Sequence, residues 1–310
     1  MDAHQKRIEF KFVLPPHLVD VLRARVGEIM EPDRGAEDGY PILSEYFDTD
    51  ERSSYWQKAM GVENRRRVRS RLYGRRDGAI PPSAFIEVKH KLDGETVKRR
   101  VMVEMNDLPM LSRGEMPDHK GEPTPTDERV MAEIRDLVQV GGSKPVVQIR
   151  YHRYAFDSGP DGTIRITFDM EPRCRFRLIP LTPDDPDFEL PLLDAGSALM
   201  EVKTIGTVPY WFRSLIGEYN LVPRSFSKYT AALEMYEFKG LANRAPSRPA
   251  PAPTARLQRK SKPTDDKGRP IPTSTSALPR RRIPEPAKTG GIFRLIAHKL
   301  WSLMAPAKVR

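Results

Sequence analysis

The stretch NRRRVRSRLYG, residues 64–74, contains five arginines, and four of them, at positions 65, 67, 69 and 71, alternate along the chain. In a β-strand, alternate side chains project from the same face of the sheet. Four like charges on one face repel one another unless an anion lies among them. The stretch therefore predicts a strand whose charged face binds an anion.

The charge of the chain is unevenly distributed. The 310 residues carry a formal net charge of +10, but residues 244–310 contain 16 Lys or Arg against 3 Asp or Glu. Residues 1–243 then hold 36 basic against 39 acidic residues, so the main body is slightly acidic. The overall basic charge therefore does not by itself indicate a nucleic-acid partner, and we expect no specific nucleic-acid binding.

Cysteine content and hydropathy limit the class of protein. Cys174 is the single cysteine, which excludes an intramolecular disulfide and a cysteine cluster for zinc, and favours a reducing compartment. No stretch approaches the roughly 20 apolar residues of a membrane span, and the first residues lack the apolar segment of a signal peptide. We therefore expect a cytoplasmic protein, soluble or peripheral at the inner face of the membrane.

The last part of the chain divides into two segments. Residues 244–291 are rich in Pro, Ser, Thr and basic residues, a composition typical of a disordered linker. Residues 292–310 begin with IFRLIAHKLWSLM, in which apolar residues follow helical spacing. This short amphipathic segment is predicted to dock on a membrane surface or a membrane-protein partner; a frayed segment without a role is the alternative.

Residues 1–243 are predicted to form one α+β domain with a mainly antiparallel sheet. Helical spacing appears in residues 17–30, in residues 126–140 with Thr126 or Asp127 as N-cap, and in residues 210–220. Turn signals at residues 93–94 and 158–162 favour hairpins over parallel crossovers. Eight strands of period two are expected, at residues 7–13, 44–48, 65–73, 84–91, 96–105, 146–157, 163–177 and 198–204.

In most of these strands one face is apolar and the other is charged. An ordinary sheet with a solvated charged face is one interpretation. The other is an eight-stranded β-barrel, with the apolar faces packed outward against helices and the charged faces lining a tunnel. The frequent use of Arg and Lys, in place of Ser, Thr and Gln, favours the tunnel, which suits a polyanion together with a divalent metal.

An ordered set of motifs, from about residue 5 to 238, resembles the VTC domain, the polyphosphate polymerase domain of the triphosphate tunnel metalloenzyme superfamily. The motifs are RIEFKF, YFDTD, Y..K..G, RVRSRLYG, FIEVKHK, VKRR, YHRYAF, RITFD, EVK and FSKYT. The resemblance implies a short antiparallel barrel lined by basic residues, which grips a triphosphate or polyphosphate chain with the help of Mn²⁺ or Mg²⁺.

The resemblance also implies roles for individual residues. Glu201 is similar to the glutamate that holds the metal, and Lys11, Arg100 and Lys91 are expected to bind substrate. Residues expected in the catalytic set are Arg69, Arg71, Lys89, Lys98, Arg153, Arg165 and Lys228. In two places the sequence departs from the pattern: Arg7 stands where the superfamily often has a first-strand glutamate, and Arg224 lies one place from the usual position.

The predicted function is a polyphosphate polymerase that transfers the γ-phosphoryl group of ATP to a growing polyphosphate chain. A triphosphate or tripolyphosphate hydrolase on the same tunnel is the first alternative, because both reactions need the same lining. A module that binds polyphosphate or inositol phosphates without turnover is the second. A nucleic-acid-binding protein acting through the basic tail is the third.

Overall fold

The structure is a computed structural model, and its description covers the main body of the chain with short gaps. The predicted linker and C-terminal segment, and most of the predicted turn residues at 93–94 and 158–162, lie outside the described residues, so the predicted domain division stays a prediction. The described residues are 7–33, 37–75, 81–92, 95–158, 163–176, 179, 181 and 187–239.

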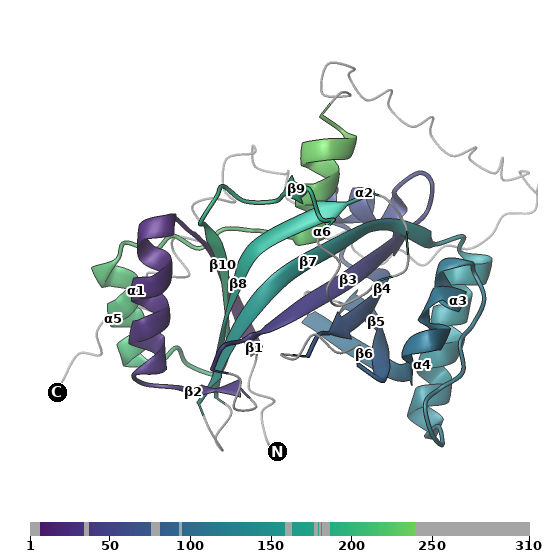
Figure 1. Ribbon diagram of the computed structural model, residues 1–310, viewed down its shortest axis with the longest axis horizontal. Helices are drawn as coiled ribbons and strands as arrows, with labels where there is room; N and C mark the ends of the chain where they lie inside the picture. The colour runs from purple at the N-terminus through teal and green to yellow at the C-terminus, as the bar shows by residue number, and fades with distance from the viewer. Residues whose placement is uncertain are drawn as a thin grey trace, which may run out of the picture. The chain divides into compact units, whose positions relative to one another are not determined.

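A single antiparallel sheet organises the described part of the chain (Figure 1). Its eight long strands follow the order β1-β10-β8-β7-β3-β4-β5-β6, and two short strands, β2 (Glu31–Pro32) and β9 (Leu190–Pro191), pair at its side. All eight predicted strands are confirmed within a few residues of their predicted ends. They are β1 (Arg7–Leu14), β3 (Tyr40–Asp48), β4 (Arg65–Tyr73), β5 (Ser83–Leu92), β6 (Glu95–Glu104), β7 (Lys144–Asp157), β8 (Ile164–Arg175) and β10 (Ala198–Ile205).

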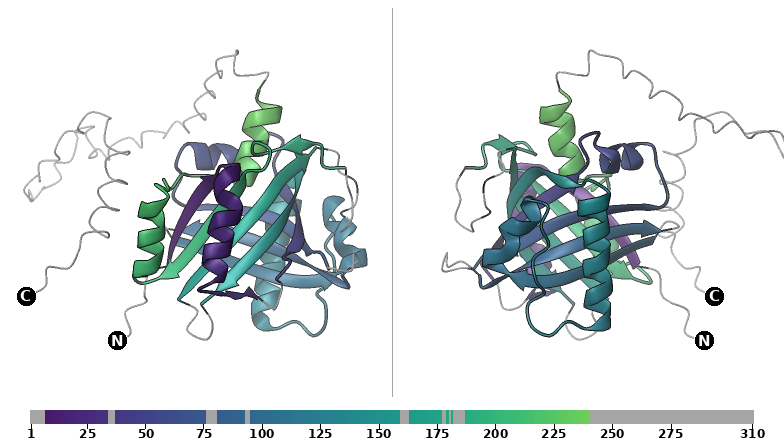
Figure 2. Two further views of the ribbon diagram at one scale, coloured as in Figure 1. Left: turned by 60° about the vertical axis from the view of Figure 1, so that its left-hand side comes forward. Right: turned by 90° about the vertical axis from the view of Figure 1, so that its right-hand side faces the viewer.

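The sheet curls into a half-barrel with a concave and a convex face (Figure 2). Strands β1 and β6 are the two ends of the strand order, and no pairing joins them among the described residues. The expected antiparallel sheet of eight strands, with helices on its outside, is therefore confirmed, in the form of a curled sheet in place of a fully closed ring.

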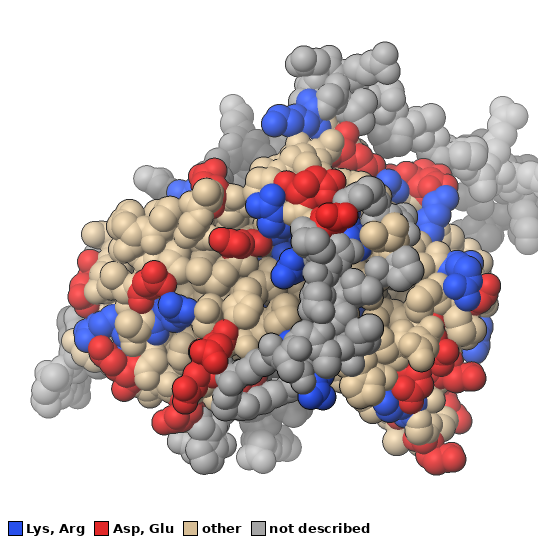
Figure 3. Space-filling view, viewed as in Figure 1, with Lys and Arg blue, Asp and Glu red and all other residues tan. Residues whose placement is uncertain are grey.

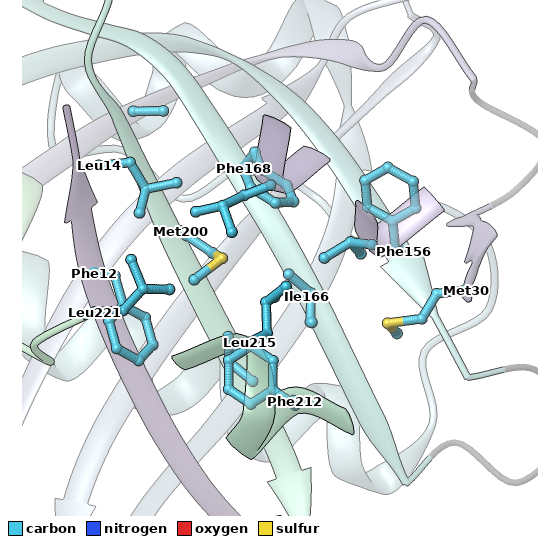
Figure 4. Close-up of a cluster of buried hydrophobic side chains, with 14 of the residues drawn as sticks. Phe12, Leu14, Met30, Phe156, Ile166, Phe168, Met200, Phe212, Leu215 and Leu221 are labelled. Carbon is cyan, nitrogen blue, oxygen red and sulfur yellow. The ribbon is translucent and has the colours of Figure 1, made fainter. Parts of the chain in front are cut away.

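Two helices cover the convex face of β1, β10 and β8. Helix α1 (Pro16–Gly27) buries Val19, Leu22 and Val26, and helix α5 (Tyr210–Glu218) buries Phe212 and Leu215. Their apolar side chains pack with those of the strands in one buried cluster, shown in Figure 4. The apolar positions of these strands therefore face outward, which leaves the alternate, charged positions on the concave side.

A second pair of helices covers the convex face of β4, β5 and β6. Helices α3 (Leu108–Ser112) and α4 (Pro125–Arg135) pack Leu108, Leu111, Val130 and Ile134 against apolar residues of these strands. The ion pairs of Arg66 on β4 with Glu133 and Asp136 add polar contacts on this side. The charged side chains of the concave face and the apolar core of the convex face therefore come from alternate residues of the same strands.

Helices α2 (Ser53–Ala59) and α6 (Lys228–Ala232) lie together at one end of the sheet (Figures 1 and 2). Tyr229 of α6 joins a buried cluster with Tyr46 and Tyr151 of the strands. Asp48 at the end of β3 accepts hydrogen bonds from the backbone N–H groups that begin α2, and from the Tyr229 hydroxyl at 2.5 Å. This buried carboxylate therefore fixes both helices to the sheet.

The three predicted helices are present, with one correction and three omissions. The N-cap of α4 is Thr124, not Thr126 or Asp127, because Thr124 and Asp127 form a reciprocal capping box. A π-helical turn at Asp136–Val140 continues α4. Helices α2, α3 and α6 were not predicted, since five to seven residues are too few for a clear helical period.

Among the helices that the structure describes, none combines the length and the apolar character that a membrane crossing requires.

Candidate functional site

The concave face gathers charged side chains from seven strands and from helix α6. The charged positions alternate with the convex core residues, so strands β4, β5, β6, β7, β8, β10 and β1 all contribute to this lining. On the outer surface seen in Figure 3, by contrast, basic and acidic side chains are scattered among wide uncharged areas.

Glu87 on β5 is the centre of one cluster of charges. Its side chain is only 1% exposed, and it accepts hydrogen bonds from Arg69 Nε at 2.7 Å and from Lys98 Nζ at 2.9 Å. Burial acts to raise the pKa of Glu87, but the charges of Arg69, Arg71 and Lys98 outweigh it and lower the pKa. Glu87 therefore stays ionised and holds Arg69, on the opposite position of β4, in a fixed orientation.

Arg71 lies on the same face of β4, two residues from Arg69, and is held by hydroxyl groups. It donates to Ser44 Oγ at 3.2 Å and to the Tyr151 hydroxyl at 3.1 Å. Arg71 makes no ion pair with any carboxylate in the described ranges. Its charge is therefore available to an anion while its position is fixed.

Asp169 on β8 is the centre of a second cluster. It is fully buried, and it accepts a two-pronged contact from Arg153 at 2.6 and 2.8 Å and a third from Lys228 at 2.5 Å. Burial acts to raise its pKa, but Arg153 and Lys228 lower it. Lys228 Nζ also lies 4.5 Å from the centre of the Tyr151 ring. Asp169 therefore brings a strand arginine and a helix lysine together.

Glu201 on β10 lies among four cations, one from the end strand β1, one from β10 itself and two from the Asp169 cluster. Its distances are 3.3 Å to Lys11, 3.4 Å to Lys203, and 3.9 Å to both Arg153 and Lys228. Burial favours the neutral carboxyl, but these charges hold the pKa of Glu201 well below its ordinary value. Glu201 is therefore an ionised oxygen donor in the middle of the lining.

Two carboxylates near Lys11 are the candidate ligands for a divalent cation. Lys11 Nζ contacts Glu201 at 3.3 Å and Glu9 at 3.2 Å, so two carboxylates converge on one point. No group of three or more His, Cys, Asp or Glu residues in the described ranges is arranged to hold a metal. Oxygen ligands suit Mg²⁺ or Mn²⁺, and Mg²⁺ commonly combines one or two carboxylates with phosphate oxygens. These two carboxylates therefore fit a divalent cation only together with further oxygen ligands.

The other predicted residues lie toward the margins of the lining. Lys89 and Lys91 continue β5 beyond Glu87, and Lys89 stands opposite Arg67. Arg100 on β6 is exposed, with its guanidinium carbon 4.6 Å from the Phe85 ring centre. Arg165 lies at the other end, where Asp33 and Asp157 accept from it at 2.5 and 3.2 Å. The structure therefore brings most of the predicted set together, and ties Arg165 into ion pairs of its own.

Several residues of the lining were not assigned to the site from the sequence. The sequence leaves Asp169 and Glu87 equally open to a role near a metal and to simple charge balance, and the structure places them at the centres of the two clusters. The sequence predicts Tyr46 as a core or turn residue; it is buried, but its hydroxyl also lies 3.3 Å from Arg69 Nη1. Burial opposes ionisation of Tyr46, yet Arg69, Arg71 and Lys228 lower its pKa to about 8. The period of two placed these residues on the charged face, but no local signal revealed their contacts.

The sequence of the chain matches the model of one known protein family. The VTC domain family matches residues 6–236. The chain belongs to the VTC domain family. The resemblance drawn from the motifs is thereby confirmed, together with its coarser consequence, a triphosphate tunnel protein of a family of enzymes that act on phosphates with divalent metals. No curated protein matches the chain.

Solved structures with a similar arrangement include three putative adenylate cyclases. The protein from Vibrio parahaemolyticus is 12% identical, with a TM-score of 0.39 over 74% of this chain and 98% of that one. The protein from Bacillus halodurans is 13% identical, with a TM-score of 0.44 over 75% and 97%. The protein from Hippeastrum, described as having a dominant triphosphatase activity, is 16% identical, with a TM-score of 0.44 over 74% and 96%.

Proposed function

We propose that the protein is an ATP-dependent polyphosphate polymerase. The observation that carries this proposal is the continuous row of oriented cations on the concave face, from Arg69 and Arg71 on β4 to Arg153 and Lys228 near Glu201. Such a row fits a chain of phosphates and offers no pattern that reads a base. Membership of the VTC domain family supports the same substrate class.

Phosphoryl transfer requires a donor held in line with the acceptor, and charge neutralised on the transferred group. In the proposed reaction, a terminal oxygen of the polyphosphate chain attacks the γ-phosphorus of ATP. The bond from that phosphorus to the β,γ-bridging oxygen breaks, and ADP leaves with the electron pair. Arg69 and Arg71 would orient the phosphate oxygens, and Arg153 and Lys228 would neutralise the charge of the transferred group.

Glu201 and Glu9 are the residues that would hold a divalent cation beside the phosphates. Bound Mn²⁺ or Mg²⁺ would neutralise charge on phosphate oxygens and orient them. Lys11 contacts both carboxylates, so it would prevent their mutual repulsion when no cation is bound.

Direct detection of the product tests the proposal. Purified protein is incubated with ATP and Mn²⁺, the products are separated on a gel that resolves polyphosphate, and ADP and orthophosphate are measured. A ladder with matching ADP is expected. Orthophosphate without a ladder would identify a hydrolase, and neither product, with tripolyphosphate still bound, would identify a binding module.

Two variants on one strand provide a matched control. Arg69→Ala removes a cation from the concave face and is expected to abolish the ladder. Arg66→Ala removes one from the convex face of the same strand, where it contacts helix α4, and is expected to retain it. Equal loss in both variants would contradict a site on the concave face.

Glu201→Gln separates catalysis from binding. A polymerase is expected to lose turnover in this variant, because Gln is a poor ligand for a divalent cation and carries no charge. Tripolyphosphate binding should remain, since the cations around Glu201 are unchanged. Undiminished turnover would exclude Glu201 as a metal ligand.

A further inference from the structure

Three cations near helices α2 and α6 differ from the rest of the lining. Arg69, Lys98, Arg153 and Lys228 each contact a buried carboxylate. By contrast, no described carboxylate forms an ion pair with Lys58, Arg67 or Lys89. Lys58 lies in the motif Y..K..G and Arg67 in the motif RVRSRLYG, but the resemblance to the VTC domain implies no role for either residue.

Arg67 is held by aromatic rings and keeps an unused donor. Its guanidinium carbon lies 4.7 Å from the centre of the Tyr229 ring and 5.7 Å from that of Tyr46. The Nη1 atom is buried and has no hydrogen-bond partner in the described part of the chain. Ring faces attract the charge but accept no conventional hydrogen bond, so this donor lacks the oxygen that it needs.

Lys58 and Lys89 surround Arg67 from a helix and a neighbouring strand. Lys58 Nζ donates to Thr230 Oγ1 of α6 at 2.8 Å, and Lys89 occupies the position opposite Arg67 in the β4–β5 pair. Burial and the charge of Arg67 lower the pKa of Lys58 to about 8. Burial, with Lys11 and Arg67, lowers that of Lys89 to about 8 against the opposite effect of Glu9. Arg67 is therefore close enough to repel each of the two lysines.

We propose that Lys58, Arg67 and Lys89 form an additional phosphate subsite at the α2–α6 end of the concave face, which holds a unit of a polyphosphate chain longer than a triphosphate. An anionic phosphate oxygen would accept from Arg67 Nη1, and the two ammonium groups would supply charge from opposite sides. This inference rests on the proposed function, and it specifies a long inorganic polyphosphate as the ligand of that site.

The aromatic residues at this end favour inorganic phosphate over a nucleoside. Tyr46 and Tyr229 stack on each other with ring centres 5.5 Å apart, and both also face Arg67. Their rings are thus engaged within the protein, and a nucleobase would have to displace Arg67 to stack on Tyr229. The subsite therefore offers charge and hydrogen-bond donors without a ring platform.

Binding of phosphate chains of two lengths tests this subsite. The affinities of the full chain and of Arg67→Gln, Lys58→Gln and the convex-face control Arg66→Gln are measured by calorimetry for tripolyphosphate and for long-chain polyphosphate. Each subsite variant should lose at least about tenfold in affinity for the long chain, the value of one charge-assisted hydrogen bond. Their affinity for tripolyphosphate, and both affinities of Arg66→Gln, should stay within about threefold.

Equal losses for both chain lengths, or no loss for either, would overturn the inference. Lys58→Gln, in the half-buried outer part of α2, provides the test if Arg67→Gln fails to fold. The result is also independent of turnover. A wild-type protein that makes no polyphosphate but shows the length-dependent loss would refute the proposed function and support the subsite. If the wild-type protein makes polyphosphate and the variants show no length-dependent loss of affinity, the proposed function is supported and the subsite is refuted.

Discussion

The cations of the concave face are held in two ways. Arg153 and Lys228 share the buried carboxylate of Asp169, as Arg69 and Lys98 share that of Glu87. Arg67 instead packs against two aromatic rings and lies near other cations, and the Asp48 carboxylate acts on it without forming an ion pair. Both groups of cations lie on one curled sheet and face the same side, so the difference is in their partners and not in their location.

The difference in partners separates the cations that contribute mainly to the stability of the fold from those that contribute mainly to ligand binding. A buried ion pair with several hydrogen bonds fixes the orientation of its cation, and the loss of one partner leaves an uncompensated charge. Cations without a carboxylate repel one another in the ligand-free protein, and an anion removes that repulsion. We therefore expect changes at Asp169 to affect stability most, and changes near Arg67 to affect ligand binding most.

The largest effect is expected from Asp169→Asn. This variant leaves Arg153 and Lys228 buried without their shared charge, and should reduce the free energy of unfolding by about 3–5 kcal/mol, measured with urea. Asp157→Asn is the matched control on a neighbouring strand. Asp157 is about one-third exposed and Arg165 keeps Asp33, so we expect a loss below about 1 kcal/mol. Similar losses in both variants would refute the distinction.

Tripolyphosphate is expected to stabilise the wild-type protein. At a concentration of about 100 times its Kd, a ligand that binds only the folded state adds about 2.7 kcal/mol, visible as a rise in Tm. Arg69→Ala should reduce this rise, and Arg66→Ala should retain it. No change in the Tm of the wild-type protein at saturating tripolyphosphate would exclude a phosphate-binding tunnel.

A smaller effect is expected from Tyr229→Phe. The variant keeps the ring that faces Arg67 but removes the hydrogen bond to Asp48, at a cost of about 1.5 kcal/mol in unfolding free energy. Polyphosphate affinity should change little, because the phosphate contacts are retained. Tyr210→Phe, at a side chain that is 77% exposed, provides the neutral control. A loss of affinity without a loss of stability would assign the hydroxyl to the ligand.

The smallest expected effect is the contribution of Lys89 to the pH dependence of stability. Lys89 has a pKa of about 8 in the folded protein, against about 10.4 in an unfolded chain. Between these values the unfolded chain binds more protons, so this residue makes stability increase with pH across that window. Lys89→Gln should reduce that increase in a series of Tm measurements from pH 7 to about pH 10.

Phosphate binding should reverse the shift of Lys58 and Lys89, because an anion favours their charged forms. Binding of long-chain polyphosphate near pH 8, which reaches the subsite of these two lysines, is then accompanied by uptake of a fraction of a proton. Calorimetry in buffers of different ionisation enthalpy measures this uptake, and Lys89→Gln should reduce it. Proton release on binding would contradict the assigned environment of both lysines.

Much of the fold could be predicted from the sequence because the strands have a clear local period. The four alternate arginines from Arg65 to Arg71 face one side of the strand, and Val68 and Leu72 face the other. The strand at residues 65–73 has the predicted ends. Short helices were missed, among them α6, which begins at Lys228 under a Ser227 cap. Five residues carry too little periodicity, and the helix is fixed mainly by Tyr229 and its bond to Asp48.

The sequence by itself determined the alternation of charge, the order of the basic motifs and the family, because each depends on residues close together in the chain. Only the tertiary structure decided which cations share a carboxylate. Lys228 reaches Asp169 from 59 positions away, and Lys58 reaches Thr230 from 172. Such contacts depend on strand register and on the curl of the sheet, which no local pattern contains. The packing of Arg67 on Tyr229, without an ion pair to any described carboxylate, is a result of that same arrangement.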